Sequence, residues 1–130
     1  MMLYRPALIL GALLGGLSVV LGAFGAHALK EVLQPAQLVT FETGVRYEMY
    51  HSFALLATGI LYAFRPTRAL RIATLLFAIG ILLFSGSIYL LVFLQNNGVG
   101  LGPVGIITPF GGLLLVAGWM ALATAFIDKK

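Results

Sequence analysis

The sequence has 130 residues, of which 61 % are hydrophobic and only 9 % are charged, and its mean hydropathy is +1.05. Soluble domains carry roughly one quarter charged residues, so this composition excludes a soluble globular protein and predicts an integral membrane protein. The absence of cysteine excludes disulfides and thiolate ligands. The net charge of +4 comes from basic residues at the ends of apolar stretches, which are typical topology signals, and we expect no nucleic-acid partner.

The first predicted span covers residues 6–27, within a stretch from Pro6 to Leu29 that carries no charge. Its 24 residues reach about 36 Å as a helix, enough to cross a hydrocarbon core of about 30 Å. A cleaved signal peptide is the alternative, because small residues flank His27, but the apolar run is longer than a signal core and favours a retained span. Small residues on one face predict close packing with another helix, within the chain or between subunits: Gly11, Gly15, Ser18, Gly22 and Gly25.

Residues 35–46 are predicted to form an amphipathic interfacial helix between the first and second spans. Pro35 suits a first helical turn, and apolar residues recur after it at helical spacing. Glu42 and Arg46 lie four residues apart in the favourable order and are expected to form a surface ion pair. A bend at Gly44 would lead into the second span, residues 47–64, which the basic segment from Arg65 to Arg71 ends.

The third predicted span covers residues 68–93 and is polar only in its second half. The glycine-rich connection, residues 95–107, is not expected to be a regular helix. Thr108 then resembles an N-cap followed by proline at the first helical position, so the fourth span is placed at 108–127. Gly111 and Gly118 form a second set of packing residues in this span.

Four spans place both termini and the 65–71 turn on one side of the membrane. That side carries six basic residues and the other carries two, which predicts termini in the cytoplasm. The six are Arg5, Arg65, Arg68, Arg71, Lys129 and Lys130, against Lys30 and Arg46.

Polar residues inside the spans collect in the outward half and define the candidate polar cluster: His27, His51, Tyr47, Ser85, Ser87 and Tyr89. Ionisable residues inside a membrane are costly and usually face a bundle interior or water. We place His27 and His51 at corresponding depths on adjacent antiparallel helices. Two histidines are too few for a zinc site, so no metal is expected. A proton-responsive histidine pair, interfacial histidines bonded to backbone, tyrosine or headgroups, and serines bonded to neighbouring helices all remain open.

Four segments in order resemble a known family: Gly-Ala-Phe-Gly-Ala-His-Ala (22–28), Phe-Glu-Thr-Gly-Val-Arg-Tyr (41–47) continuing to His51, Leu-Phe-Ser-Gly-Ser-Ile-Tyr (83–89) and Ile-Thr-Pro-Phe-Gly-Gly (107–112). The chain resembles the YgdD-like family of small bacterial inner-membrane proteins of unknown function, which has distant eukaryotic transmembrane relatives. The resemblance covers nearly the whole chain. It implies a four-span protein of the bacterial cytoplasmic membrane and transfers no biochemical activity.

The predicted fold is an all-α, single-domain, four-helix transmembrane bundle with the interfacial helix between spans one and two. We expect a non-enzymatic membrane protein without a cofactor, which acts by packing with itself, with a membrane-protein partner or with membrane lipid. The alternative is a small-solute or proton-linked carrier with an outward-facing polar pocket around the two histidines. An enzyme is the third hypothesis, since a serine nucleophile would need a base and an oxyanion site that the sequence does not fix.

Overall fold

The computed structural model describes residues 1–127 and contains, in this part of the chain, four long helices and one short 3-10 helix. The long helices are α1 (Arg5–Ala26), α2 (Pro35–Phe64), α3 (Arg68–Asn96) and α4 (Val104–Thr124), and the 3-10 helix η1 (Leu29–Glu31) lies between α1 and α2. α1, α3 and α4 are long and apolar enough to cross a membrane. The chain is therefore an all-helical membrane protein, as its composition predicts.

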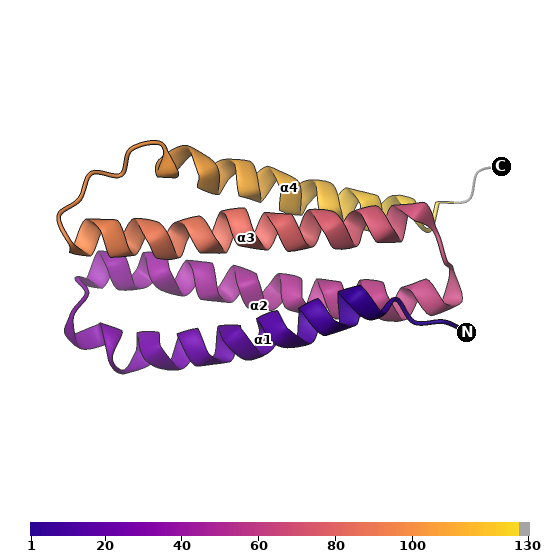
Figure 1. Ribbon diagram of the computed structural model, residues 1–130, viewed down its shortest axis with the longest axis horizontal. Helices are drawn as coiled ribbons and strands as arrows, with labels where there is room; N and C mark the ends of the chain where they lie inside the picture. The colour runs from indigo at the N-terminus through magenta and orange to yellow at the C-terminus, as the bar shows by residue number, and fades with distance from the viewer. Residues whose placement is uncertain (128–130) are drawn as a thin grey trace.

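The helices run antiparallel and lie in the order α1, α2, α3, α4 across the molecule (Figure 1). Within residues 1–127, extensive packing joins α1 to α2, α2 to α3 and α3 to α4, whereas α1 and α4 make no extensive contact. The arrangement is therefore a row with α2 and α3 in the middle, rather than a closed ring of four helices. The outer helices expose large apolar side chains, as lipid-facing helices do, including Leu13 on α1 and Leu113 on α4.

Local sequence signals explain most helix ends. Gln34 and Gln37 form a capping box at the start of α2, and the Gln34 N–H donates to the Gln37 side-chain oxygen over 2.9 Å. α2 ends before Pro66, and the Thr67 hydroxyl caps α3 by accepting from the Leu70 N–H. At the far end of α3, Gly98 has φ +68 and closes a Schellman motif, in which the Val99 N–H donates to the Leu94 carbonyl over 2.9 Å.

The expected interfacial helix 35–46 is not a separate element, because α2 is continuous from Pro35 to Phe64. Gly44 does not interrupt the helix. It lets α3 approach, since a Cβ at this position would lie 2.8 Å from a Tyr89 ring carbon and 3.0 Å from Ile88. At the same place the Ser85 hydroxyl of α3 donates a hydrogen bond to the Gly44 carbonyl over 2.7 Å and so joins the two helices. Close packing between helices, not a break, therefore explains this glycine.

The predicted start of the last helix at Thr108 is wrong. α4 begins at Val104, Pro103 occupies the N-cap position, and Pro109 lies inside the helix. The Thr108 hydroxyl caps nothing, because it is hydrogen-bonded to the Ser87 hydroxyl over 2.5 Å. A proline in the second turn removes one backbone hydrogen bond but leaves the first turn possible, so a Thr-Pro pair did not have to begin the helix.

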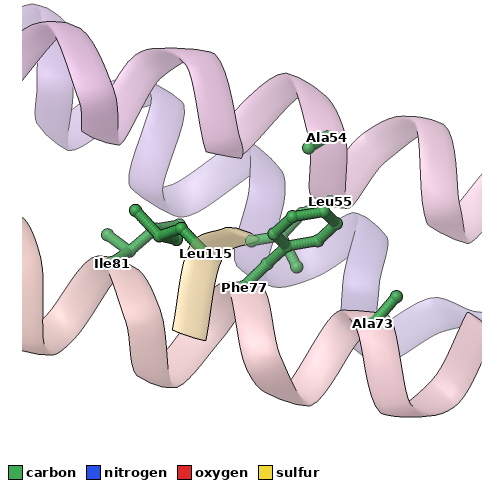
Figure 2. Close-up of a cluster of buried hydrophobic side chains, with 6 residues drawn as sticks. All are labelled: Ala54, Leu55, Ala73, Phe77, Ile81 and Leu115. Atoms are coloured by element: carbon green, nitrogen blue, oxygen red, sulfur yellow. The ribbon is translucent and has the colours of Figure 1, made fainter. Parts of the chain in front are cut away.

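The apolar core lies where α2, α3 and α4 meet. Its buried members are Ala54, Leu55, Ala73, Phe77, Ile81 and Leu115 (Figure 2). Phe77 and Leu55 are fully buried, and Leu14 of α1 packs against the same cluster. Gly118 makes room for Phe77, whose ring would lie 2.7 Å from an added Cβ. This core holds the middle of the row together and leaves the polar side chains on either side of it.

Candidate functional site

Glu48 of α2 is a buried carboxylic acid at the centre of the molecule. Its side chain is only 2 % exposed, and its Oε2 accepts a hydrogen bond of 2.5 Å from the Tyr89 hydroxyl of α3. The residue lies about 20 Å from the start of α2 and about 24 Å from its end. An ionisable group in such a place is expensive, and in membrane helices it marks a functional site by default.

Hydroxyl groups join three helices close to Glu48. The Ser18 hydroxyl of α1 donates to the Val45 carbonyl of α2 over 2.9 Å, and the Ser85 hydroxyl of α3 donates to Gly44 on the other flank of α2. The Ser52 hydroxyl stays within α2 and donates to the Glu48 backbone carbonyl over 2.7 Å. Polar groups away from water must find partners inside the protein, and these three have done so.

The second carboxylate oxygen of Glu48, Oε1, is different. No residue of the described chain donates a hydrogen bond to it. Every fully buried side-chain oxygen and nitrogen in residues 1–127 has a partner, so Oε1 cannot be fully buried. Oε1 is therefore open to the adjoining pocket. That pocket measures about 150 Å³ and is lined by Glu48, Ser85 and Tyr89 together with apolar residues of α1 and α3: Leu14, Leu17, Ala78, Ile81, Leu82 and Gly86.

The pocket opens sideways, between α1 and α3. Two of its walls are lipid-exposed side chains, since Leu17 of α1 is 46 % exposed and Leu82 of α3 is 69 % exposed. α2 forms the floor, which is possible because α1 and α3 flank α2 without packing extensively on each other. A molecule would thus reach Glu48 from the apolar side of the protein rather than from a helix end.

His51 is buried and fully partnered. Its Nε2 accepts from the Trp119 indole N–H of α4 over 3.1 Å, and its Nδ1 lies 2.7 Å from the Tyr47 carbonyl. Because an indole can only donate, Nε2 must be unprotonated and Nδ1 carries the proton, which defines a neutral imidazole. Aromatic contacts complete the setting, with the Phe77 ring centroid 5.7 Å from that of His51 and 5.3 Å from that of Trp119. His51 therefore has no free nitrogen for a ligand.

The two histidines do not lie at corresponding depths, which corrects the expectation. Gly25 of α1 faces Phe41 of α2, while Gly11 faces Ser52, the neighbour of His51. Because Ser52 also faces Gly15, His27, beyond Gly25, is displaced from His51 by about 18 to 24 Å along α1. The prediction started the second span near residue 47, which put His51 close to the beginning of that helix. Because α2 starts at Pro35, His51 lies near its middle. His27 is exposed, and its Nδ1 lies 3.0 Å from its own Ala23 carbonyl.

The remaining members of the predicted polar cluster divide between two helix pairs. Tyr89 belongs to the Glu48 site, and its ring packs 5.2 Å from that of Phe41. Ser87 joins α3 to α4 through Thr108. Tyr47 is 41 % exposed, with its ring 4.9 Å from that of Phe84. The cluster is thus not one site, and only Ser85 and Tyr89 of its members line the pocket beside Glu48.

The small residues predicted for helix packing lie at two interfaces. All five on α1 face α2. Ser18 makes the hydrogen bond to Val45 described above. Added Cβ atoms at the four glycines would meet residues of α2: Ser52 and Leu56 at Gly11, Ser52 at Gly15, Val45 at Gly22 and Phe41 at Gly25. On α4, Gly111 contacts the backbone of Leu83 and Phe84, and Gly118 contacts Phe77. Close approach of backbones without side-chain obstruction is what such residues permit in membranes.

Glu42 and Arg46 are both exposed on α2, but the structure forms no ion pair between them. They lie on a separate face from Glu48, along a groove between α1 and α2. Histidine and glutamate side chains in residues 1–127 form no group of three that could hold a metal ion.

Glu48 and the His51–Trp119 pair were missed as site features by the sequence reasoning. A usable signal existed, because Gly44, Glu48 and Leu55 recur at helical spacing on the buried face of α2. A carboxylate on the apolar face of a helix is more informative than one on a polar face. The partner of His51 lies 68 residues away and has no local signal.

The fold and this site define the chain as a small helical membrane protein with a carboxyl group inside its helix row. Comparison with known proteins agrees with that class: residues 21–112 match the family described as "Protein of unknown function (DUF423)". The chain belongs to this family, and the resemblance inferred from the four segments is confirmed.

Relatives match over almost their whole length. A "UPF0382 membrane protein" of Haemophilus influenzae is 43 % identical over 95 % of this chain and 94 % of its own. A "UPF0382 membrane protein" of Staphylococcus saprophyticus is 41 % identical over 88 % of this chain and 91 % of its own. The "UPF0382 inner membrane protein YgdD" of Escherichia coli is 32 % identical over 97 % and 92 %. No solved structure matches the chain.

Proposed function

We propose that the protein is a non-enzymatic membrane protein that binds the polar group of a lipid-phase molecule at Glu48. The observation that carries the proposal is the free Oε1 of a 98 % buried carboxyl group in a pocket that opens sideways to the membrane. A carboxyl oxygen in this position is a hydrogen-bond acceptor with no partner supplied by the protein. Leaving it so costs free energy that a suitable ligand would recover.

The chemistry of the pocket selects the ligand class. Its volume of about 150 Å³ admits a small head such as an ammonium or hydroxyl group with the first carbons of a chain, and its walls are otherwise apolar. Glu48 would accept the hydrogen bond, while Tyr89 holds the carboxyl group in place from the other side. An anionic head would be repelled by an ionised Glu48. We therefore infer an alkyl amine or alcohol type of ligand that is dissolved in the membrane.

The proposed topology has four spans, because α2 is taken to cross the membrane in addition to α1, α3 and α4. Support comes from the 30-residue length of α2 and its place between α1 and α3, both apolar enough to cross a membrane. Residues 35–40 would then project beyond the end of α1 into the interface. The N-terminus, the 65–67 turn and the end of α4 lie at one end of the row (Figure 1), which carries Arg5, Arg65, Arg68 and Arg71. We place this end in the cytoplasm and the protein in the bacterial inner membrane.

A carrier built around the two histidines has no geometric support, since His51 is fully partnered and His27 is displaced from it by about 18 to 24 Å along α1. Serine hydrolysis lacks a base, because Ser85 and Ser87 donate or share their hydroxyls with Gly44 and Thr108 rather than with an imidazole. Binding without chemistry is the function that the Glu48 site supports best.

The test uses three probes of equal chain length, dodecylamine, dodecanol and dodecanoic acid, with the protein in nanodiscs. We expect saturable binding of the amine and the alcohol and much weaker binding of the acid. Gly86→Leu adds a side chain to the pocket wall at a position where an added Cβ would meet only Leu82 at 3.9 Å, and it should abolish this binding. The matched control is Gly16→Leu, at an exposed position of α1 where nothing lies within 4 Å. Equal binding by both variants would overturn the proposal.

A further inference from the structure

A second hollow lies on the opposite flank of α1, between α1 and α2. This groove measures about 330 Å³, and its apolar walls include Gly22, Val45 and Met49. Glu42 and Arg46 stand on its α2 edge, where both are exposed. The Glu48 pocket shares none of its lining residues, so the two sites are separate.

The depth of the two charges follows from the contacts of their neighbours. Phe41, next to Glu42, packs against Gly25 at the end of α1. Val45, next to Arg46, contacts both Ser18 and Gly22, which places the Arg46 Cα about 6 to 12 Å inside the end of α1. Glu42 therefore lies near the membrane boundary, and Arg46 is anchored about one turn deeper, from where its long side chain extends back towards the boundary.

Neither charge is neutralised within the described chain. Glu42 and Arg46 form no ion pair with each other or with another residue of the 1–127 segment. A charge held inside the hydrocarbon boundary without a partner is costly, and such residues bind counter-charges. The arrangement thus offers an acceptor for a cation on the outside and a donor for an anion on a side chain whose Cα lies about 6 Å further in.

We propose that this groove binds a phospholipid whose headgroup carries a primary ammonium beyond its phosphate. The phosphate meets the Arg46 guanidinium, the ammonium lies further out at the Glu42 carboxylate, and an acyl chain lies along the groove against Gly22 and Val45. From outside to inside, the protein presents the negative Glu42 and then the positive Arg46. Such a headgroup presents its positive ammonium and then its negative phosphate, so each charge meets its opposite. Guanidinium and phosphate are a strong, geometrically matched pair.

Two other occupants fit less well. A purely anionic headgroup would bring its charge against Glu42, which repels it. A second copy of the chain related by a two-fold axis would place groove against groove, because such an interface uses the same patch on both subunits. Two hollows facing each other leave unfilled space, whereas an acyl chain fills one hollow.

The experiment measures the lipid retained by the delipidated full-length protein in detergent, by native mass spectrometry. The probes are phosphatidylethanolamine, phosphatidylglycerol and phosphatidylcholine with the same two oleoyl chains. Wild-type protein should bind phosphatidylethanolamine at least about fivefold more tightly than phosphatidylglycerol, a difference of about 1 kcal/mol by conversion of that ratio. Phosphatidylcholine should bind weakly, since its methylated ammonium donates no N–H to Glu42.

Charge variants separate the contributions. Glu42→Gln should remove the preference for phosphatidylethanolamine over phosphatidylglycerol, while Arg46→Gln should weaken binding of all three probes. Gly22→Leu should block the groove itself, because its Cβ lies at an ordinary 3.5 Å from Val45 and the helix pair can keep its packing. Glu31→Gln, an exposed acid of η1 outside the groove, is the control and should behave as wild type.

Equal retention of the three lipids by the wild type would overturn the proposal. So would a dimer mass that disappears in Glu42→Gln, since a second copy would then occupy the groove. Each variant's helix content and melting temperature in detergent shows whether it is folded, and both charged residues are exposed, so these substitutions should leave the fold unchanged.

Discussion

The face of α2 that carries Glu48 and the face that carries Glu42 place the same chemical group in opposite settings. Glu48 lies between α1 and α3 and accepts a hydrogen bond from Tyr89, on a face where Gly44 packs closely against Tyr89 and Ile88 of α3. Glu42, six residues earlier, touches no charged partner and borders an open groove. The buried face is organised by hydrogen bonds between helices, whereas the exposed face offers charges to something outside the chain. Substitutions on the first should change stability, and substitutions on the second should change binding alone.

The largest effect is expected from Gly44→Leu. The added side chain has no room against Tyr89 and Ile88, so α2 and α3 must separate and lose both the Ser85–Gly44 and the Glu48–Tyr89 hydrogen bonds. We expect a loss of about 3 kcal/mol in unfolding free energy, measured by steric trapping or denaturation in mixed micelles. The control is Gly16→Leu, which makes the same change in open space on α1. Equal stability of the two variants would contradict the close α2–α3 contact.

Glu48→Ala should come next. It removes the acceptor for the half-buried Tyr89 hydroxyl and leaves a cavity beside α3, for an expected loss of about 2 kcal/mol. Glu42→Ala, on the open face, should leave the unfolding curve unchanged. Similar curves for both alanine variants would mean that the two faces of α2 do not differ as described.

Tyr89→Phe is a smaller change at the same contact. It keeps the ring against Phe41 and removes only the hydroxyl, so we expect a loss of about 1 kcal/mol, within the range for hydrogen bonds between membrane helices. A double-mutant cycle with Glu48→Gln isolates the pair. A coupling energy of zero would show that the hydroxyl and the carboxyl group do not interact.

His51→Phe should have the smallest effect on stability among the substitutions at hydrogen bonds between helices. It keeps an aromatic ring beside Phe77 but leaves the Trp119 N–H without its acceptor, for an expected loss of about 0.5 to 1 kcal/mol. The binding of amine and alcohol probes at Glu48 should be unchanged, and a loss of that binding would place His51 in the site.

The sequence was sufficient for the features that depend on local spacing. The small residues of α1 recur on one helical face, and that face is the one that meets α2. It was insufficient for features that depend on how far one helix slides along another. The polar character of residues 35–46 favoured a separate interfacial helix, whereas Gly44 and Ser85 hold this stretch against α3 as part of one long helix. Because the start of this helix was predicted too late, His51 was placed at the wrong depth. Glu48 was not recognised as a site residue, since its partner Tyr89 is 41 residues away in the sequence.

The hydrogen bond from Trp119 to His51 gives the molecule an optical reporter. The chain has one tryptophan, and its indole N–H is tied to α2 although its own helix, α4, lies at the outer edge of the row. Emission from this single residue depends on whether that N–H is bonded and on how polar its surroundings are. Any movement of α4 away from α2, on ligand binding or on transfer from detergent to bilayer, should therefore change the fluorescence of the unlabelled protein.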